Sequence, residues 1–181
     1  PDEIGGVRAA LSELTGFGHR RIGFVQSALP MPATELRLAG YREFMNSLAG
    51  FDPRLVAADD TTGPGGYRAA RALLELPEEL RPTALFCFND RMAMGAYQAV
   101  ADLGLQVGRD ISIVGFDDQE LISANLRPGL TTVALPHAEM GRWAVETLMD
   151  SIERGETEQP QTALMACPLV RRASVDVPPR P

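Results

Sequence analysis

Two uninterrupted apolar segments constrain the fold of this chain most, because acidic and amide side chains follow each of them directly. The segments are Thr83–Phe88 and Ile111–Phe116, and a segment of helical period at 91–103 lies between them. A continuous apolar run is typical of a strand that is buried on both faces. The unit therefore predicts a strand, a helix and a second, parallel strand. Asn89-Asp90 and Asp117-Asp118 then follow the carboxyl ends of neighbouring strands, which is the edge where open α/β sheets bind ligands.

The rest of the chain continues this alternation. Periodicity and capping residues indicate further helices at 3–16, 34–48, 67–76 and 137–153, and short apolar runs indicate strands at 22–26, 55–58, 130–135 and 164–170. The sequence therefore predicts an α/β fold with a mostly parallel sheet and helices on both faces, in one lobe or two. Because the chain opens on a helix, we expect that earlier strand–helix units are missing from it. Residues 155–160 are interpreted as a linker and 173–181 as a mobile Pro-rich tail.

An acidic composition without lysine excludes several functions. The formal net charge is −7, which makes this chain a poor partner for a phosphate backbone. All 17 basic residues are Arg, so Schiff-base and Walker lysines are excluded. No apolar stretch is long enough to cross a bilayer and no signal peptide opens the chain, although a leader removed before Pro1 stays an alternative.

Residues suited to catalysis or metal binding are sparse. The two histidines, His19 and His137, lack a metal-type spacing, and the sequence has neither Cys-x-x-Cys nor Gly-x-Ser-x-Gly. We therefore expect no enzyme, no metal site and no cofactor. His19 is interpreted as a local hydrogen-bonding residue and Cys87 as a small core residue. The Gly-Pro-Gly-Gly segment at 63–66 lacks phosphate-loop spacing and is interpreted as a flexible loop that opens a helix.

One Arg, one Asn and one Asp at the ligand edge form a candidate binding set. They are Arg37, near the start of the second helix, Asn89 and Asp117. The structural alternatives are a solvated charge for Arg37, a helix cap for Asn89, and a Mg²⁺ site for Asp117 with Asp118, although the missing Lys counts against the last. We assign the helix cap to Asp90, which leaves the amide of Asn89 for the cleft. Adjacent sugar hydroxyls match Arg and carboxylate geometry, so the set predicts polyol binding.

Seven segments of the chain resemble the effector-binding core of LacI/GalR-type transcriptional repressors, in family order and at family spacing. They are GHRRIGFV (18–25), RLAGYREF (37–44), PTALFCFNDRMAMGA (82–96), GLQVGRDISIVGFDD (104–118), RPGLTTV (127–133), MGRWAV (140–145) and LVRRAS (169–174). As a set they are highly specific and cover nearly all of the chain, whereas any one of them alone is a weak signal.

The resemblance implies a periplasmic-binding-protein-like fold, in which two α/β subdomains flank a ligand cleft. Residues 1–133 and 155–175 then correspond to a nearly complete C-terminal subdomain. Residues 134–154 correspond to a remaining helix of the N-terminal subdomain, which is otherwise mostly absent, and 176–181 form a tail.

The same resemblance implies that the chain senses a small-molecule effector, with a sugar as the expected class. Arg37, Asn89 and Asp117 match the positions that commonly hold the effector, whereas Thr61 and Thr62 stand where an aromatic residue often stacks on the sugar. DNA would be bound only through a helix-turn-helix that this chain lacks, in a cytoplasmic protein without membrane contacts. A periplasmic sugar-binding receptor of a transport system is the alternative.

Family members usually form side-by-side dimers, so the resemblance also implies a homodimer. Met92, Met94 and Leu121 match that surface, and a place in the helix core is the alternative for Met94. The apolar stripe of helix 137–153 would normally pack on the missing sheet. We therefore expect this helix to dock on a neighbouring chain or to be poorly ordered, and we expect the chain by itself to bind an effector weakly.

Overall fold

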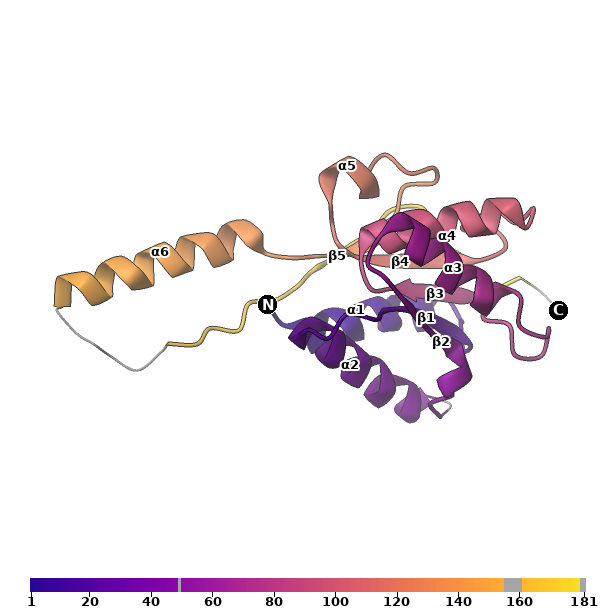
Figure 1. The fold of residues 1–181 in the computed structure, drawn as a ribbon, viewed down its shortest axis with the longest axis horizontal. Helices are drawn as coiled ribbons and strands as arrows, with labels where there is room; N and C mark the ends of the chain where they lie inside the picture. The colour runs from indigo at the N-terminus through magenta and orange to yellow at the C-terminus, as the bar shows by residue number, and fades with distance from the viewer. Residues whose placement is uncertain (49, 155–160, 180–181) are drawn as a thin grey trace.

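A six-stranded sheet forms the body of the computed structural model, which describes residues 1–48, 50–154 and 161–179 (Figure 1). The strands are β1 (Ile22–Ser27), β2 (Val56–Asp59), β3 (Ala84–Cys87), β4 (Ser112–Asp117), β5 (Thr131–Ala134) and β6 (Leu169–Val170). They lie in the order β2-β1-β3-β4-β5-β6; the first five are parallel, and β6 is antiparallel to β5. The predicted α/β class with a mostly parallel sheet is confirmed.

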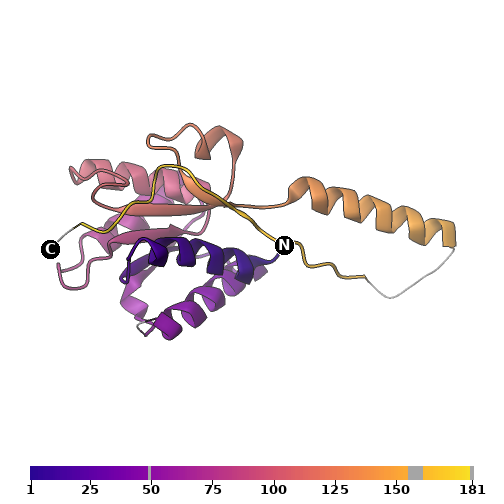
Figure 2. The ribbon, with the colours of Figure 1, turned by 180° about the vertical axis from the view of Figure 1, so that it is seen from behind.

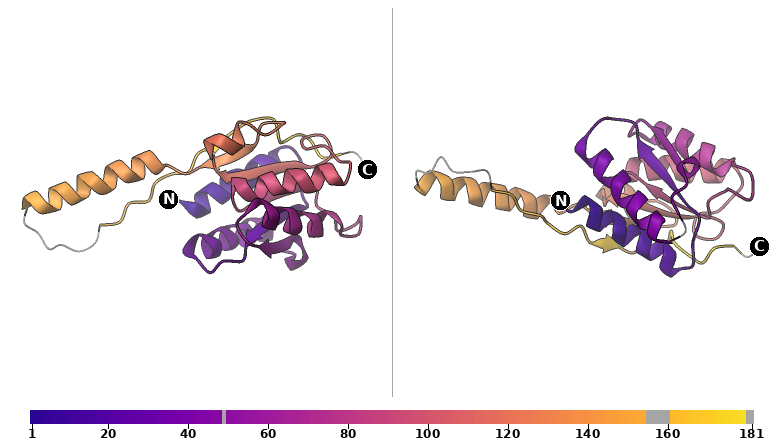
Figure 3. Two further views of the ribbon diagram at one scale, coloured as in Figure 1. Left: turned by 45° about the horizontal axis from the view of Figure 1, so that its top comes forward. Right: turned by 90° about the horizontal axis from the view of Figure 1, so that it is seen from below.

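Helices cover both faces of this sheet (Figure 1, Figure 3). The two layers are α1 (Glu3–Gly16) with α2 (Pro32–Leu48) on one face, and α3 (Gly63–Leu74) with α4 (Asp90–Asp102) on the other. The split follows from handedness: right-handed crossovers that step in opposite directions along a sheet place their helices on opposite faces. Three more helices complete the described part: η1 (Pro53–Leu55), α5 (Glu120–Ser123) and α6 (His137–Arg154).

Continuous apolar burial explains why the central strands form where the sequence predicts them. Every residue of β1 and β3 is buried, as expected for strands that are covered on both faces. The ring of Phe86 on β3 lies 4.8 Å from that of Phe24 and 6.5 Å from that of Phe116. The aromatic chain continues to Tyr41 of α2, whose hydroxyl donates to the carbonyl of Ile22 at 2.6 Å. These contacts fix α2 against the strands that carry the ligand edge.

The start of α3 differs from the sequence prediction. Residues 63–66 form its first turn, after a cap by Thr62, so their interpretation as a flexible loop is wrong. These glycines let α3 and α4 touch backbone to backbone: a Cβ atom on Gly95 of α4 would lie 1.9 Å from the carbonyl oxygen of Gly63. The glycines therefore serve close helix packing.

The C-terminal segment is also more ordered than the sequence predicts. Ser174 is buried, donates to the carbonyl of Ile113 at 2.6 Å and accepts the N–H of Thr131 at 2.8 Å. Residues 173–176 therefore pack along the sheet, and their interpretation as part of a mobile tail is wrong. The strand predicted at 164–170 is confined to β6.

His19 takes the structural role that the sequence predicts. Its Nδ1 shares a 2.9 Å hydrogen bond with the hydroxyl of Thr83, and its Nε2 lies 2.8 Å from the carbonyl oxygen of Asp176. Burial lowers the pKa of this imidazole, which is almost fully covered. The residue joins the first helix–strand turn to the C-terminal segment. Cys87 is likewise a free, buried core residue.

Helix α6 stands away from the body, and Figure 2 shows it projecting from the side where the N-terminus also lies. A poorly ordered segment was one of the alternatives expected from the sequence, whereas the structure has one continuous helix. Its side chains Val145, Leu148, Met149 and Ile152 are exposed. Docking on a neighbouring chain stays a prediction, and the predicted linker at 155–160 falls outside the described residues. Among the described helices, none has the length and apolar content needed to span a membrane.

Candidate functional site

The topology places the predicted binding residues at one edge of the sheet. The strand order reverses between β1 and β3, and open α/β sheets bind ligands beyond the carboxyl ends of their strands at such a reversal. Arg37 comes from α2, which follows β1; Asn89 follows β3 within two residues; and Asp117 is the last residue of β4. Three separate segments thus deliver the three side chains to the ligand edge.

The guanidinium of Arg37 is the centre of this group. Its Nη1 donates to the carbonyl oxygen of Phe88, the residue before Asn89, and its Nη2 lies 3.6 Å from Oδ1 of Asp117. The rings of Phe88 and Phe116 lie over the guanidinium carbon, with ring centroids at 4.5 and 3.6 Å. Arg37 is 3% exposed, so its interpretation as a solvated helix charge does not hold. The structure brings Arg37 and Asp117 together, with the backbone of Asn89 adjacent.

Glu3 is a member of this group that the sequence analysis missed. Its Oε2 accepts a 2.6 Å hydrogen bond from Nε of Arg37, and both side chains are nearly inaccessible to solvent. Glu3 is the first residue of α1, where an acidic side chain is favoured by the helix dipole. That ordinary explanation hid it, because the sequence gives no sign that α1 and α2 bring these two residues together.

Asn89, rather than Asp90, caps α4, so the predicted assignment of the cap is wrong. Oδ1 of Asn89 accepts the N–H of Met92 at 2.8 Å, and Nδ2 donates to the carbonyl of Thr61 at 3.3 Å. The amide therefore joins the ends of β2 and β3. Nδ2 has a second N–H, which can donate a hydrogen bond to a ligand, although Asn89 is only 3% exposed.

Asp90 is instead a buried carboxyl beneath the site. Its Oδ2 accepts the N–H of Gln119 at 2.7 Å and its Oδ1 accepts the hydroxyl of Thr132 at 2.6 Å. Burial raises the pKa of Asp90 to about 7; these two hydrogen bonds oppose the shift, and the charges of Asp117 and Asp118 add to it. The side chain therefore ties the start of α4 to the turn after β4 and to β5.

The turn after β4 has an uncommon backbone. Asp117 and Asp118 have φ angles of 106° and 50°, positive values that residues other than Gly adopt uncommonly, although Asn, Asp and His do so more often than the rest. The side-chain Nε2 of Gln119 donates to Oδ2 of Asp117 at 3.1 Å. Burial raises the pKa of Asp117, and the charge of Arg37 opposes that rise only in part. This partly buried carboxyl is therefore a strong hydrogen-bond acceptor.

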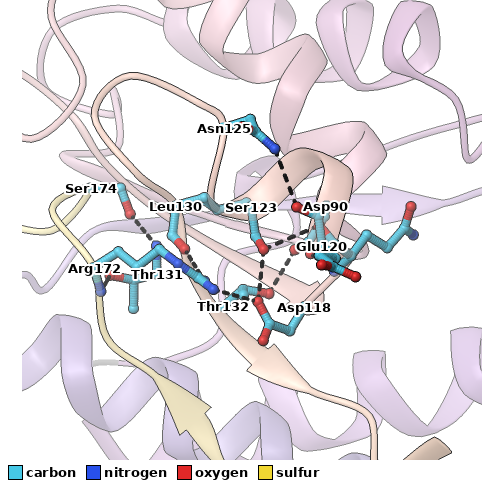
Figure 4. A network of polar contacts seen from close by, with 11 residues as sticks. Asp90, Asp118, Glu120, Ser123, Asn125, Leu130, Thr131, Thr132, Arg172 and Ser174 are labelled. Atoms are coloured by element: carbon cyan, nitrogen blue, oxygen red, sulfur yellow. Dashed lines mark hydrogen bonds and ion pairs between the residues drawn. The ribbon is translucent and has the colours of Figure 1, made fainter.

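Figure 4 shows the polar network that holds this turn from the other side. Arg172 donates from Nη2 to Oδ1 of Asp118 at 2.9 Å and from Nη1 to the carbonyl of Leu130 at 2.8 Å. Ser123 of α5 donates to the same Asp118 oxygen at 2.7 Å. Asp118 is thus occupied by protein partners, which counts against the Mg²⁺ alternative. Across the described residues, no group of three or more His, Cys, Asp or Glu side chains could hold a metal ion.

The candidate dimer residues divide into two kinds. Met92 is fully buried inside the chain and cannot line a surface, so this part of the prediction is wrong. The methyl group of Met94 lies 3.1 Å from where a Cβ atom on Gly63 would be, so this side chain contributes to the packing of α3 on α4. Leu121 on α5 is 87% exposed and is the one suited to contact a second chain.

Comparison with known proteins identifies the family of this chain. Residues 11–175 match the model of the periplasmic binding protein-like domain. The chain belongs to this family. Its relatives are LacI-type repressors, and the predicted resemblance to their effector-binding core is confirmed.

Two curated relatives and two solved structures illustrate the similarity. The ribose operon repressor of Haemophilus influenzae is 35% identical over 92% of this chain and 49% of its own length. The HTH-type transcriptional repressor CytR of Escherichia coli is 38% identical over 91% of this chain and 48% of its own length. A complex of the transcriptional regulator CelR with cellobiose has a TM-score of 0.86 at 34% identity, covering 96% of this chain and 52% of that one. A LacI-family regulatory protein from Chloroflexus aggregans has a TM-score of 0.87 at 35% identity, covering 96% and 62%. This chain spans about half the length of the curated relatives.

Proposed function

We propose that this chain is the effector-sensing part of a LacI-type transcriptional regulator and that it catalyses no reaction. The observation that carries the proposal is the meeting of Arg37 and Asp117, from α2 and β4, at the reversal of strand order. In this proposal, 1–133 and 155–175 form one subdomain, and 134–154, which contains α6, belongs to a second subdomain that would close over the ligand edge.

The geometry favours a polyhydroxy ligand such as a sugar. The 3.6 Å separation of Nη2 of Arg37 from Oδ1 of Asp117 is too long for a direct hydrogen bond. A ligand hydroxyl placed beside both can accept from the guanidinium and donate to the carboxylate, which satisfies all three groups. The second hydrogen of the Asn89 amide offers one more donor. Ribose and cellobiose, which appear in the names of similar proteins, are the first sugars to test.

The turn after β4 offers a route from ligand binding to a change elsewhere. Asp117 faces the candidate ligand position, and the adjacent Asp118 is bonded to Ser123 of α5 and to Arg172. A ligand that reorients Asp117 would therefore shift Asp118 and its hydrogen bond to α5. The same helix carries the exposed Leu121. We propose a homodimer in which this coupling alters operator binding by a separate DNA-binding part, in the cytoplasm.

Isothermal titration of the 181-residue chain with a sugar panel tests the proposal. We expect one sugar to bind more weakly than micromolar, and Asp117→Asn to weaken that binding by about 10- to 100-fold through loss of a charge-assisted hydrogen bond. Asn tolerates the positive φ of residue 117, so the variant isolates the charge. Glu35→Gln, on the exposed side of α2, is the matched control. Equal affinities for all three proteins would reject the site.

The coding sequence upstream of this chain separates the proposal from its alternative. A helix-turn-helix there is expected for a regulator, whereas a secretion leader would identify a periplasmic sugar receptor. The relatives named above are repressors, which favours the first outcome.

A further inference from the structure

Glu3 stands out because it occupies one side of the only guanidinium in the proposed site, among the residues that the structure describes. The Nε of Arg37 is held by Glu3 at 2.6 Å, and Nη1 is held by the carbonyl of Phe88. The ring centroids of Phe88 and Phe116 lie 4.5 and 3.6 Å from the guanidinium carbon. The third nitrogen, Nη2, lies 3.6 Å from Oδ1 of Asp117, which is too long for a direct hydrogen bond. The protein therefore fixes which edge of Arg37 a ligand can reach.

The fold is built to bring Glu3 to this position. Asp2 caps α1, which places Glu3 in the first turn at the ligand edge. A Cβ atom on Gly6 would lie 2.8 Å from the ring of Phe116, so only glycine lets the start of α1 approach so closely. That approach puts the Glu3 carboxylate against the guanidinium of Arg37.

The charges around this guanidinium do not favour an anion. Two carboxyl groups, Glu3 at 2.6 Å and Asp117 at 3.6 Å, share the single positive charge of Arg37. Asp118 nearby is already matched by Arg172 at 2.9 Å. A phosphate or carboxylate entering the gap would meet a guanidinium whose charge is compensated and a second carboxylate beside it, whereas an uncharged hydroxyl meets no such repulsion.

We propose that Glu3 is a specificity-determining residue, which cancels the charge of Arg37 so that the site accepts uncharged hydroxyl groups and rejects phosphorylated or carboxylated ligands. This inference rests on the proposed function, since it names the ligand class of the same site. It adds a residue outside the set of Arg37, Asn89 and Asp117. Glu3 acts through Arg37, so its effect is expected on the choice between ligands.

Inorganic phosphate is the probe, because it requires no knowledge of the natural effector. We expect phosphate to give the wild-type chain no thermal shift and no saturable change in its amide NMR spectrum. In Glu3→Gln, phosphate affinity is expected to rise by at least about tenfold, because one like charge close to the anion is removed. Arg37→Met in the Glu3→Gln background is expected to abolish that gain.

Glu13→Gln is the matched control for this experiment. Glu13 lies on the same helix and is also paired with an arginine, Arg171 at 2.7 Å, far along α1 from the site. We expect this variant to bind phosphate as weakly as the wild-type chain. If Glu3→Gln does not fold, Glu3→Met fills the same space without charge and carries the same expectation.

Three outcomes decide the proposal. A Glu3 variant that is less stable but binds phosphate no better than Glu13→Gln would show a purely structural ion pair and would overturn it. A gain in phosphate binding that survives Arg37→Met would overturn it too, since the anion would then bind elsewhere. A gain that depends on Arg37 supports it, even if the sugar panel fails and the proposed function with it.

Discussion

At the scale of single residues, the buried carboxyl of Asp90 links the site to pH. Burial raises its pKa from 3.8 to about 7, so the folded protein holds a proton that the unfolded chain releases at lower pH. A group of this kind contributes stability that is fully present below its unfolded pKa. That stability is lost as the pH rises through the folded pKa near 7. Burial also raises the pKa of the neighbouring site residue Asp117.

Asp90→Asn is therefore expected to flatten the pH dependence of stability. The wild-type chain should lose roughly 1–3 kcal/mol of unfolding free energy between about pH 5 and about pH 8, at about 1.4 kcal/mol per pKa unit. The Asn variant keeps an acceptor for Gln119 but has no proton to lose. Denaturant unfolding at several pH values measures the difference, with Glu35→Gln as the control. A wild-type curve as flat as that of the variant would contradict the role of Asp90.

The exchange of roles between Asn89 and Asp90 shows what sequence reasoning could not reach at this scale. Both residue types cap helices, so the sequence predicted a cap but could not say which residue forms it. Partners distant in sequence decide it: Thr132 and the backbone of Gln119 hold the Asp90 carboxyl, which leaves Asn89 to cap α4. The position of Asp117 was predictable because it directly follows an apolar run, whereas Arg37 was proposed from its place near the start of the second helix and from the family resemblance.

At the scale of elements, the contact between α3 and α4 depends on glycines. The Cβ atom of an alanine at position 95 would lie 1.9 Å from the carbonyl oxygen of Gly63 and 2.5 Å from the backbone N of Tyr67. Gly95→Ala must push the two helices apart and is expected to cost about 2–4 kcal/mol. Gly16→Ala, where nothing lies within 4 Å, is the control and is expected to change stability little. Chemical denaturation compares the two; equal midpoints would contradict the packing.

The same contact explains why strands were easier to predict than the start of α3. Uninterrupted apolar runs such as Thr83–Phe88 and Ile111–Phe116 have few structures open to them, and β3 and β4 formed there. A Gly-Pro-Gly-Gly segment is compatible with a loop, or with a helix that presses against another backbone. The neighbour that decides between these, α4, begins 27 residues after Gly63 and is not visible in the local pattern.

At the scale of the whole molecule, contacts between distant segments were beyond the sequence. Glu3 meets Arg37 across 34 positions, and Arg172 meets Asp118 across 54. Each pair is formed only after the sheet brings its segments together. The family resemblance supplied the general architecture, yet it gave no indication that α1 contributes a side chain to the ligand edge.

Exposed apolar side chains on α5 and on α6 are candidates for covering by further protein, and these two helices lie on different parts of the molecule (Figure 1). One is Leu121 on α5, which is 87% exposed, and the other is the stripe on α6 that includes Leu148. α5 is bonded through Ser123 to Asp118, so an interface there would sense the turn that carries Asp117. We therefore assign the interface of the proposed homodimer to α5, and we expect the remainder of the proposed second subdomain to cover the apolar stripe of α6.

If the proposed homodimer forms through α5, Leu121→Asp is expected to convert it into a monomer, because a buried charge without a partner costs several kcal/mol at an interface. Sedimentation velocity over a range of concentrations measures the mass, and Val177→Asp, at an exposed apolar position on the C-terminal segment, is the control. Leu121 is preferable to Met94 as a probe, since Met94 also packs against α3 and its loss would disturb the fold. Leu148→Asp is expected to leave the dimer intact. A dimer that survives Leu121→Asp but dissociates in Leu148→Asp would place the interface on α6 and reject a route from Asp117 through α5.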